Sequence, residues 1–157
     1  MFAAESAAVT RALGFNVVAI HHIGSTAIPP IHAKPVIDML VEVLDHGETD
    51  GCNAAMEALG YEPRGEFGIP GRRFFRKNDA SGVRTHHIHA FVAGSPEIVR
   101  HLAFRDFMRA HPEHAAQYSM LKQKLAAAHS HDIEAYMDGK DAFIKETDRK
   151  AALWRSA

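Results

Sequence analysis

Residues 20–43 read IHHIGSTAIPPIHAKPVIDMLVEV. An apolar segment ends at Gly24-Ser25, a proline-rich loop follows, and a second apolar segment carries one acidic side chain, Asp38. Glycine lets a backbone approach a ligand closely, and backbone amides beside a hydroxyl form a seat for an anion. A carboxylate opposite a bound phosphate usually implies a divalent metal ion between them, because the ion neutralises both. This stretch therefore predicts a phosphate-binding turn with Asp38 facing it.

The pattern GSTAIP, then four residues, then KPVID resembles the GrpB-like proteins, a group assigned to the nucleotidyltransferase superfamily. The resemblance continues through RTHHIHAFV (84–92), HLAFRDFMRAHPEHAAQYSMLKQKLA (101–126) and AYMDGKDAFIKE (135–146). It implies an α/β (α+β) nucleotidyltransferase-like fold and a relation to the extension domain of some dephospho-CoA kinases. It also implies metal-dependent nucleotidyl transfer, with Gly24, Ser25 and Asp38 in the site. The superfamily pattern has a second acidic residue two positions after the first, where this chain has Leu40.

The overall composition suits one domain, residues 1–157, because 46% hydrophobic residues can build a core in a chain of this length. The 18 Lys and Arg balance the 19 Asp and Glu, so no strong attraction to nucleic acid or membranes is indicated. Cys52 is the single cysteine, which excludes an internal disulfide. No leader pattern and no bilayer-length apolar run is present. We therefore expect a soluble cytoplasmic protein, and the oligomeric state stays open.

The periodicity of apolar residues predicts a mixed sheet within residues 15–92 and a helical part within residues 96–154 that packs on it. Alternation puts Asp38, Leu40 and Glu42 on one face of their strand. Glycines and prolines predict a loop over 61–71. The expected helices are 2–13, 49–59, one from Ser95-Pro96, one from His111-Pro112 and 132–154, and the expected strands are 15–23, 36–44, 72–77 and 83–92.

Two of the twelve histidines, His87 and His89, fall on one face of a predicted strand. A His-x-His pair can give two imidazole nitrogens to one metal ion. If this strand lies beside Asp38, the ligands become one carboxylate and two imidazoles. Carboxylates suit Mg²⁺ or Mn²⁺, whereas imidazoles extend the choice to Zn²⁺ or Ni²⁺. The alternative is two partly buried histidines that bond to the backbone.

Basic side chains surround the two aromatic residues of the predicted hairpin, and arginine binds phosphate oxygens in a fork. Solvated surface charges are the alternative. Thr26 offers a second hydroxyl beside the turn, and Lys34 can neutralise phosphate or pair with Asp38. Basic residues of the helical part, among them Lys122 and Lys140, can line the same cleft or form surface ion pairs. The candidate phosphate- or nucleotide-binding residues are Gly24, Ser25, Thr26, Lys34, Arg73, Arg76 and Lys77.

Three functions remain open at this point. The first is metal-dependent transfer onto or from a nucleotide phosphate, with Asp38 and Ser25 as catalytic residues and Asp38, His87 and His89 as metal ligands. The second is a non-catalytic module that binds a nucleotide or other small phosphorylated molecule, which Leu40 favours. The third is a single-metal hydrolase that uses Asp38, His87 and His89. The sequence does not decide whether the protein is an enzyme.

Overall fold

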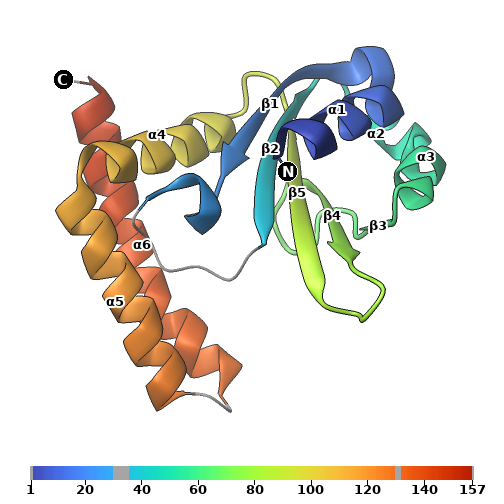
Figure 1. The fold of residues 1–157 in the computed structure, drawn as a ribbon. Helices are drawn as coiled ribbons and strands as arrows, with labels where there is room; N and C mark the ends of the chain where they lie inside the picture. The colour runs from blue at the N-terminus through green and yellow to red at the C-terminus, as the bar shows by residue number, and fades with distance from the viewer. Residues whose placement is uncertain (1, 30–35, 130–131, 157) are drawn as a thin grey trace.

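A five-stranded mixed sheet forms the centre of the fold, with helices on both of its faces (Figure 1). The structure is a computed structural model that describes residues 2–29, 36–129 and 132–156. The helices and strands, in chain order, are α1 (Phe2–Leu13), η1 (Gly14–Asn16), β1 (Val17–Ile23), η2 (Ser25–Ala27), β2 (Ile37–Val43), α2 (His46–Gly51), α3 (Asn53–Ala58), β3 (Tyr61–Pro63), β4 (Arg73–Asn78), β5 (Arg84–Val92), α4 (Pro96–Ala110), α5 (Pro112–Ala128) and α6 (Ile133–Ser156).

The strands lie in the order β1-β2-β5-β4-β3. β2 and β5 are parallel neighbours, and the other three pairs are antiparallel. In the parallel pair, Asp38 lies opposite His87 and Leu40 lies opposite His89. Residues at matching positions of adjacent strands point to the same face of a sheet. The register therefore brings the carboxylate of β2 next to the imidazoles of β5.

One face of the sheet packs against α1 and α3 and holds the main core. Met39, Val41 and Ile88 from the strands are fully buried there with Val9 of α1 and Met56 of α3. Each fully buried aliphatic side chain of this kind contributes about 1.5–3 kcal/mol to folding. The main core lies on the opposite face from Asp38, because alternate residues of a strand point to opposite sides.

The other face is covered in part by α4, and α5 and α6 pack beside α4 (Figure 1). Leu40 and Phe91 from the sheet form a small core with Ile98 of α4. Pro96 follows the N-cap residue Ser95, whose side chain accepts a hydrogen bond from the backbone N–H of Glu97. This arrangement starts α4 at the end of β5 and turns the chain back across the sheet.

The structure confirms the predicted mixed sheet followed by a helical part. Several predicted bounds are one or two residues off, and two segments differ from the sequence prediction in kind. Tyr61–Pro63, predicted as loop, forms the edge strand β3, where Pro63 ends the strand and its missing N–H costs little. The single helix predicted over 49–59 is wrong, since the structure has two short helices there, α2 and α3. The first starts at His46, because Asp45 caps it by accepting from the N–H of Glu48 at 3.0 Å. Across the residues described here, every helix is too short or too polar to span a membrane.

Candidate functional site

Asp38 lies at the centre of the candidate site, on the sheet face that carries α4. Its Oδ1 is 3.2 Å from Nδ1 of His87 and 3.3 Å from Nε2 of His89. The structure thus brings together the acidic residue and the two histidines that the sequence singled out. All three side chains are largely buried, with 16–27% of their side-chain area exposed.

Two arginines define which ring nitrogens carry the protons. Arg72 Nη1 is 3.2 Å from Nδ1 of His89, and Arg84 Nη1 is 3.1 Å from Nε2 of His87. A guanidinium can only donate, so the imidazole nitrogen that faces it must accept. The proton of each ring therefore sits on the nitrogen that faces Asp38. Both histidines donate to the carboxylate, and each is held from behind by an arginine.

The carboxyl group of Asp38 is ionised in this setting. Burial alone raises its pKa, but the hydrogen bonds from His87 and His89 outweigh burial and lower the pKa to about 2. The negative charge of Asp38 also attracts two lysines of the helical part electrostatically. It acts on Lys122 of α5 and Lys140 of α6, whose pKa values are lowered by burial and partly raised again by Asp38.

The turn after β1 lies directly against Asp38. Gly24 has a φ of 77° and a ψ of −175°, a conformation that is essentially restricted to glycine. A Cβ at this position would lie 2.5 Å from Oδ2 of Asp38. The next residue, Ser25, accepts a hydrogen bond from Nζ of Lys122 at 2.7 Å. The turn therefore links the acidic residue of the sheet to a lysine almost a hundred residues later in the chain.

Two arginines of α4 hold this turn from either side. Arg105 donates to the carbonyl of His22 at 3.3 Å, and Arg109 donates to the carbonyl of Ala27 at 2.9 Å. His101, one turn earlier on α4, is close to His89, with 5.8 Å between the ring centres. Burial, followed by the nearby Arg100, lowers the pKa of His101 to about 3. Helix α4 thus positions the turn and adds a neutral imidazole to the site.

Of the remaining predicted binding residues, one lies in the turn and two lie on the other face of the sheet. Thr26 ties the turn together, since its hydroxyl donates to the carbonyl of Val36 at 3.3 Å. Arg73 and Lys77 project from the opposite face of the sheet, where they pair with Asp50 and Glu5. The structure does not bring these two residues to Asp38. Lys34 lies outside the described residues.

Arg76 shares the face of Asp38, but Glu62 holds its Nε at 2.9 Å. Neither residue that follows Asp38 on its face adds a carboxylate to the site. Leu40 is fully buried, and Glu42 pairs with His21 at 2.6 Å. Among the described residues, Asp38 therefore has no acidic companion of the kind expected from the sequence resemblance.

The arrangement does not fit a bound metal ion. A ligating imidazole keeps its proton on the nitrogen away from the metal and donates it to an acceptor. In His87 and His89 those nitrogens face the donor groups of Arg84 and Arg72. Within the described ranges, no three or more His, Cys, Asp and Glu side chains form a group suited to hold a metal ion.

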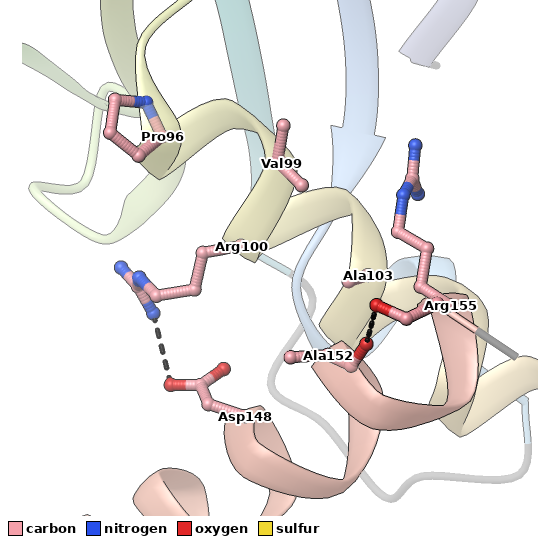
Figure 2. A pocket seen from close by; sticks show the side chains of 8 residues that line it. Pro96, Val99, Arg100, Ala103, Asp148, Ala152 and Arg155 are labelled. Atoms are coloured by element: carbon pink, nitrogen blue, oxygen red, sulfur yellow. Dashed lines mark hydrogen bonds and ion pairs between the residues drawn. The ribbon is translucent and has the colours of Figure 1, made fainter.

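A separate hollow of about 290 Å³ lies between α4 and α6, lined by residues of these two helices and not by Asp38, His87 or Ser25 (Figure 2). Figure 2 shows Arg100 reaching toward Asp148, 3.3 Å away, across this hollow. Arg100 also pairs with Glu97, and Arg155 lies 3.9 Å from Asp106. Because both arginines have acidic partners, the hollow carries little uncompensated charge. We therefore place the candidate site at Asp38.

Residues 1–150 match the family model described as "GrpB protein". The chain belongs to the GrpB family. A crystal structure described as conserved protein GrpB from Enterococcus faecalis is 42% identical in sequence and has a TM-score of 0.92, covering 99% of this chain and 93% of that one. The fold prediction is thus confirmed by a solved GrpB structure.

Two further relatives are of different lengths. The UPF0157 protein YqkA of Bacillus subtilis is 46% identical over 98% of this chain, which spans only 44% of that protein's length. A dephospho-CoA kinase of Mycobacterium leprae is 26% identical over 90% of this chain, which covers 41% of the kinase. The predicted relation to dephospho-CoA kinases is therefore also confirmed.

Proposed function

We propose that this chain binds the phosphate group of a small phosphorylated molecule, a nucleotide or another phosphometabolite. The phosphate would lie beside Gly24-Ser25 and within reach of Lys122 and Lys140. The observation that carries the proposal is an excess of positive charge around a single buried carboxylate. Asp38 is already satisfied by two imidazole N–H groups. The cations around it therefore keep capacity for a second anion.

Four basic side chains contribute to this excess. In the described part of the chain, none of them has a carboxylate within 4 Å of its charged nitrogens, whereas Arg73 and Lys77 on the opposite face are each paired with one. Burial lowers the pKa of Lys122, Lys140 and Arg72, which means that their charged forms are poorly solvated. A bound phosphate stabilises such groups by charge-assisted hydrogen bonds. The four side chains are Arg72, Arg84, Lys122 and Lys140.

Binding without transfer agrees better with the side chains than two-metal nucleotidyl transfer does. Two-metal transfer needs ligands that hold two ions roughly 3.5–4 Å apart. Leu40 stands where the second carboxylate is expected, and Glu42 is occupied by His21. The tautomers of His87 and His89 likewise oppose a single-metal hydrolase. The sequence predicts a divalent ion at Asp38, whereas these tautomers favour binding without one, and titration of untagged protein with metal ions decides between the two.

Calorimetric titration with ATP and with inorganic tripolyphosphate tests the proposal. We expect both anions to bind wild-type protein with one site per chain. Lys122→Met is expected to weaken both about 10- to 100-fold, since it removes a charge-assisted hydrogen bond. Lys124→Met is the matched control, because Lys124 lies on the same helix with its side chain exposed.

The outcomes separate the three candidate functions. Saturable binding that depends on Lys122, with no turnover, supports the binding module. Pyrophosphate release from ATP in the presence of Mg²⁺ or Mn²⁺ would replace it by nucleotidyl transfer. Metal-dependent release of inorganic phosphate would replace it by hydrolysis. Equal affinities for wild type, Lys122→Met and Lys124→Met would show that the anion binds elsewhere.

A further inference from the structure

Phe67 combines a disfavoured backbone conformation with a half-exposed side chain. Its φ of 50° makes it the one non-glycine residue at positive φ among the residues that the structure describes. A bulky side chain is disfavoured in this left-handed region. Phe67 is 49% exposed, so burial of its side chain offsets little of the free-energy cost of this conformation. Strained residues of this kind cluster at ligand sites, where the strain keeps a side chain in place.

Arg72 holds the strained segment and joins it to the candidate site. Its guanidinium donates to the carbonyl of Phe67 at 2.9 Å and to the carbonyl of Glu66 at 3.2 Å. The same group donates to Nδ1 of His89. The side chain of Glu66 in turn accepts from the backbone N–H of Gly71 at 2.7 Å. The segment around Phe67 is therefore fixed by the same arginine that orients a histidine of the site.

A row of aromatic rings leads from Phe67 to the two histidines. The rings of Phe67 and Phe74 are stacked, with centres 5.2 Å apart and planes within 8° of parallel. Phe74 lies 5.4 Å from the ring of His87 and 5.3 Å from the ring of His89. Two ring spacings thus separate the half-exposed Phe67 from the imidazoles that contact Asp38. A planar group stacked at Phe67 would therefore lie two ring spacings from these imidazoles.

Two guanidinium groups lie over the Phe67 ring. Arg64 is 5.0 Å and Arg76 is 5.8 Å from its centre. Glu62 holds both, accepting from Arg64 at 2.7 Å and from Arg76 at 2.9 Å. Arginine planes and phenyl rings are the groups on which proteins stack nucleobases. This corner of the sheet therefore offers flat cationic and aromatic surface to a planar ligand.

We infer that Phe67 with Arg64 and Arg76 forms a stacking platform for the base of a nucleotide whose phosphates occupy the site beside Ser25 and Lys122. The inference rests on the proposed phosphate site and adds the chemical class of its ligand. Stacking uses the π-face that every base has, so the platform discriminates weakly between bases. Its contribution is to favour a nucleotide over an inorganic phosphate chain.

The test measures the affinities of ATP and inorganic tripolyphosphate for wild type, Phe67→Ala, Phe67→Trp and Phe15→Ala. Phe67→Ala is expected to weaken ATP about 5- to 150-fold and to leave tripolyphosphate unchanged. Phe67→Trp is expected to restore ATP binding. Phe15→Ala is the matched control, since Phe15 is 76% exposed and belongs to η1, before β1. It should change neither affinity.

The other outcomes would overturn either the stacking platform alone or the phosphate site as well. Unchanged ATP affinity in Phe67→Ala removes the platform and leaves the phosphate site in place. An equal loss for both anions also removes the platform, because it assigns Phe67 a structural role. Failure of wild type to bind either anion overturns the proposed function itself, and the platform with it.

Discussion

Replacing Gly24 by alanine is the most revealing single change, because the sheet leaves no room for a side chain at the turn. The new Cβ would lie 2.5 Å from Oδ2, 2.9 Å from Cβ and 3.0 Å from Cγ of Asp38. Separations under 3.0 Å force one of the partners to move. Asp38 has little freedom to move, since its other oxygen accepts from both His87 and His89.

The expected cost has two parts. A non-glycine residue at this combination of φ and ψ costs about 1–3 kcal/mol, and overpacking against a fixed neighbour costs about 1–3 kcal/mol more. We expect Gly24→Ala to lower the free energy of unfolding by about 2–6 kcal/mol. Equilibrium unfolding in urea, followed by circular dichroism, measures this loss.

Gly82→Ala separates the two parts. Gly82 has a φ of 83°, and an added Cβ would meet nothing within 4 Å. This control should cost only the backbone penalty of about 1–2 kcal/mol. In an Asp38→Gly background, which removes the crowded atoms, the cost of Gly24→Ala should fall to the backbone part alone, about 1–3 kcal/mol. Equal costs for Gly24→Ala and Gly82→Ala in the wild-type background would refute the close contact with Asp38.

Three further predictions concern acid stability, a buried hydroxyl and metal ions. His101, with a native pKa of about 3 against an ordinary 6.5, stays neutral while the unfolded chain takes up a proton below pH 6.5. Stability should therefore fall between pH 6.5 and 3, by about 2 kcal/mol at pH 5, and urea unfolding of His101→Gln should lack this part of the fall. Tyr61→Phe removes a donor that lies 2.7 Å from Oε1 of Glu5 and should cost about 1–3 kcal/mol in the same assay, and a loss under about 0.5 kcal/mol would contradict it. Untagged protein should show no stoichiometric Zn²⁺ or Mn²⁺ binding by calorimetry, and binding that Asp38→Ala abolishes would show that the histidine tautomers rearrange around an ion.

Local sequence patterns were sufficient for the parts of the site that lie on single strands. Period-2 alternation put His87 and His89 on one face and separated them from Ile88, which is fully buried in the main core. The sequence also singled out Gly24 for a close approach of the backbone to a ligand, whereas its positive φ and its contact with Asp38 come from the structure. Which strand lies beside which depends on long-range packing. The convergence of Asp38 with the two histidines therefore required the parallel pairing of β2 and β5.

The cationic half of the site was less predictable. Lys122 and Lys140 come from helices that follow the sheet, and the sequence left open whether they line the cleft or form surface ion pairs. For the basic residues of the hairpin, the sequence does not show which of the two faces carries the site. Alternation divides them between two faces, but only the burial of Phe75 in the main core shows that Arg73 and Lys77 point away from Asp38. Arg72 lies in the predicted strand 72–77 but is not among the candidate binding residues, although it supports both His89 and the loop at Phe67.

A crystal structure of this chain grown with ATP would show where the phosphates bind. We expect a phosphate oxygen within hydrogen-bonding distance of both Ser25 Oγ and Lys122 Nζ, about 2.7–3.2 Å from each. An ATP phosphate bound instead in the hollow between α4 and α6, with the bond between Ser25 and Lys122 intact, would contradict it.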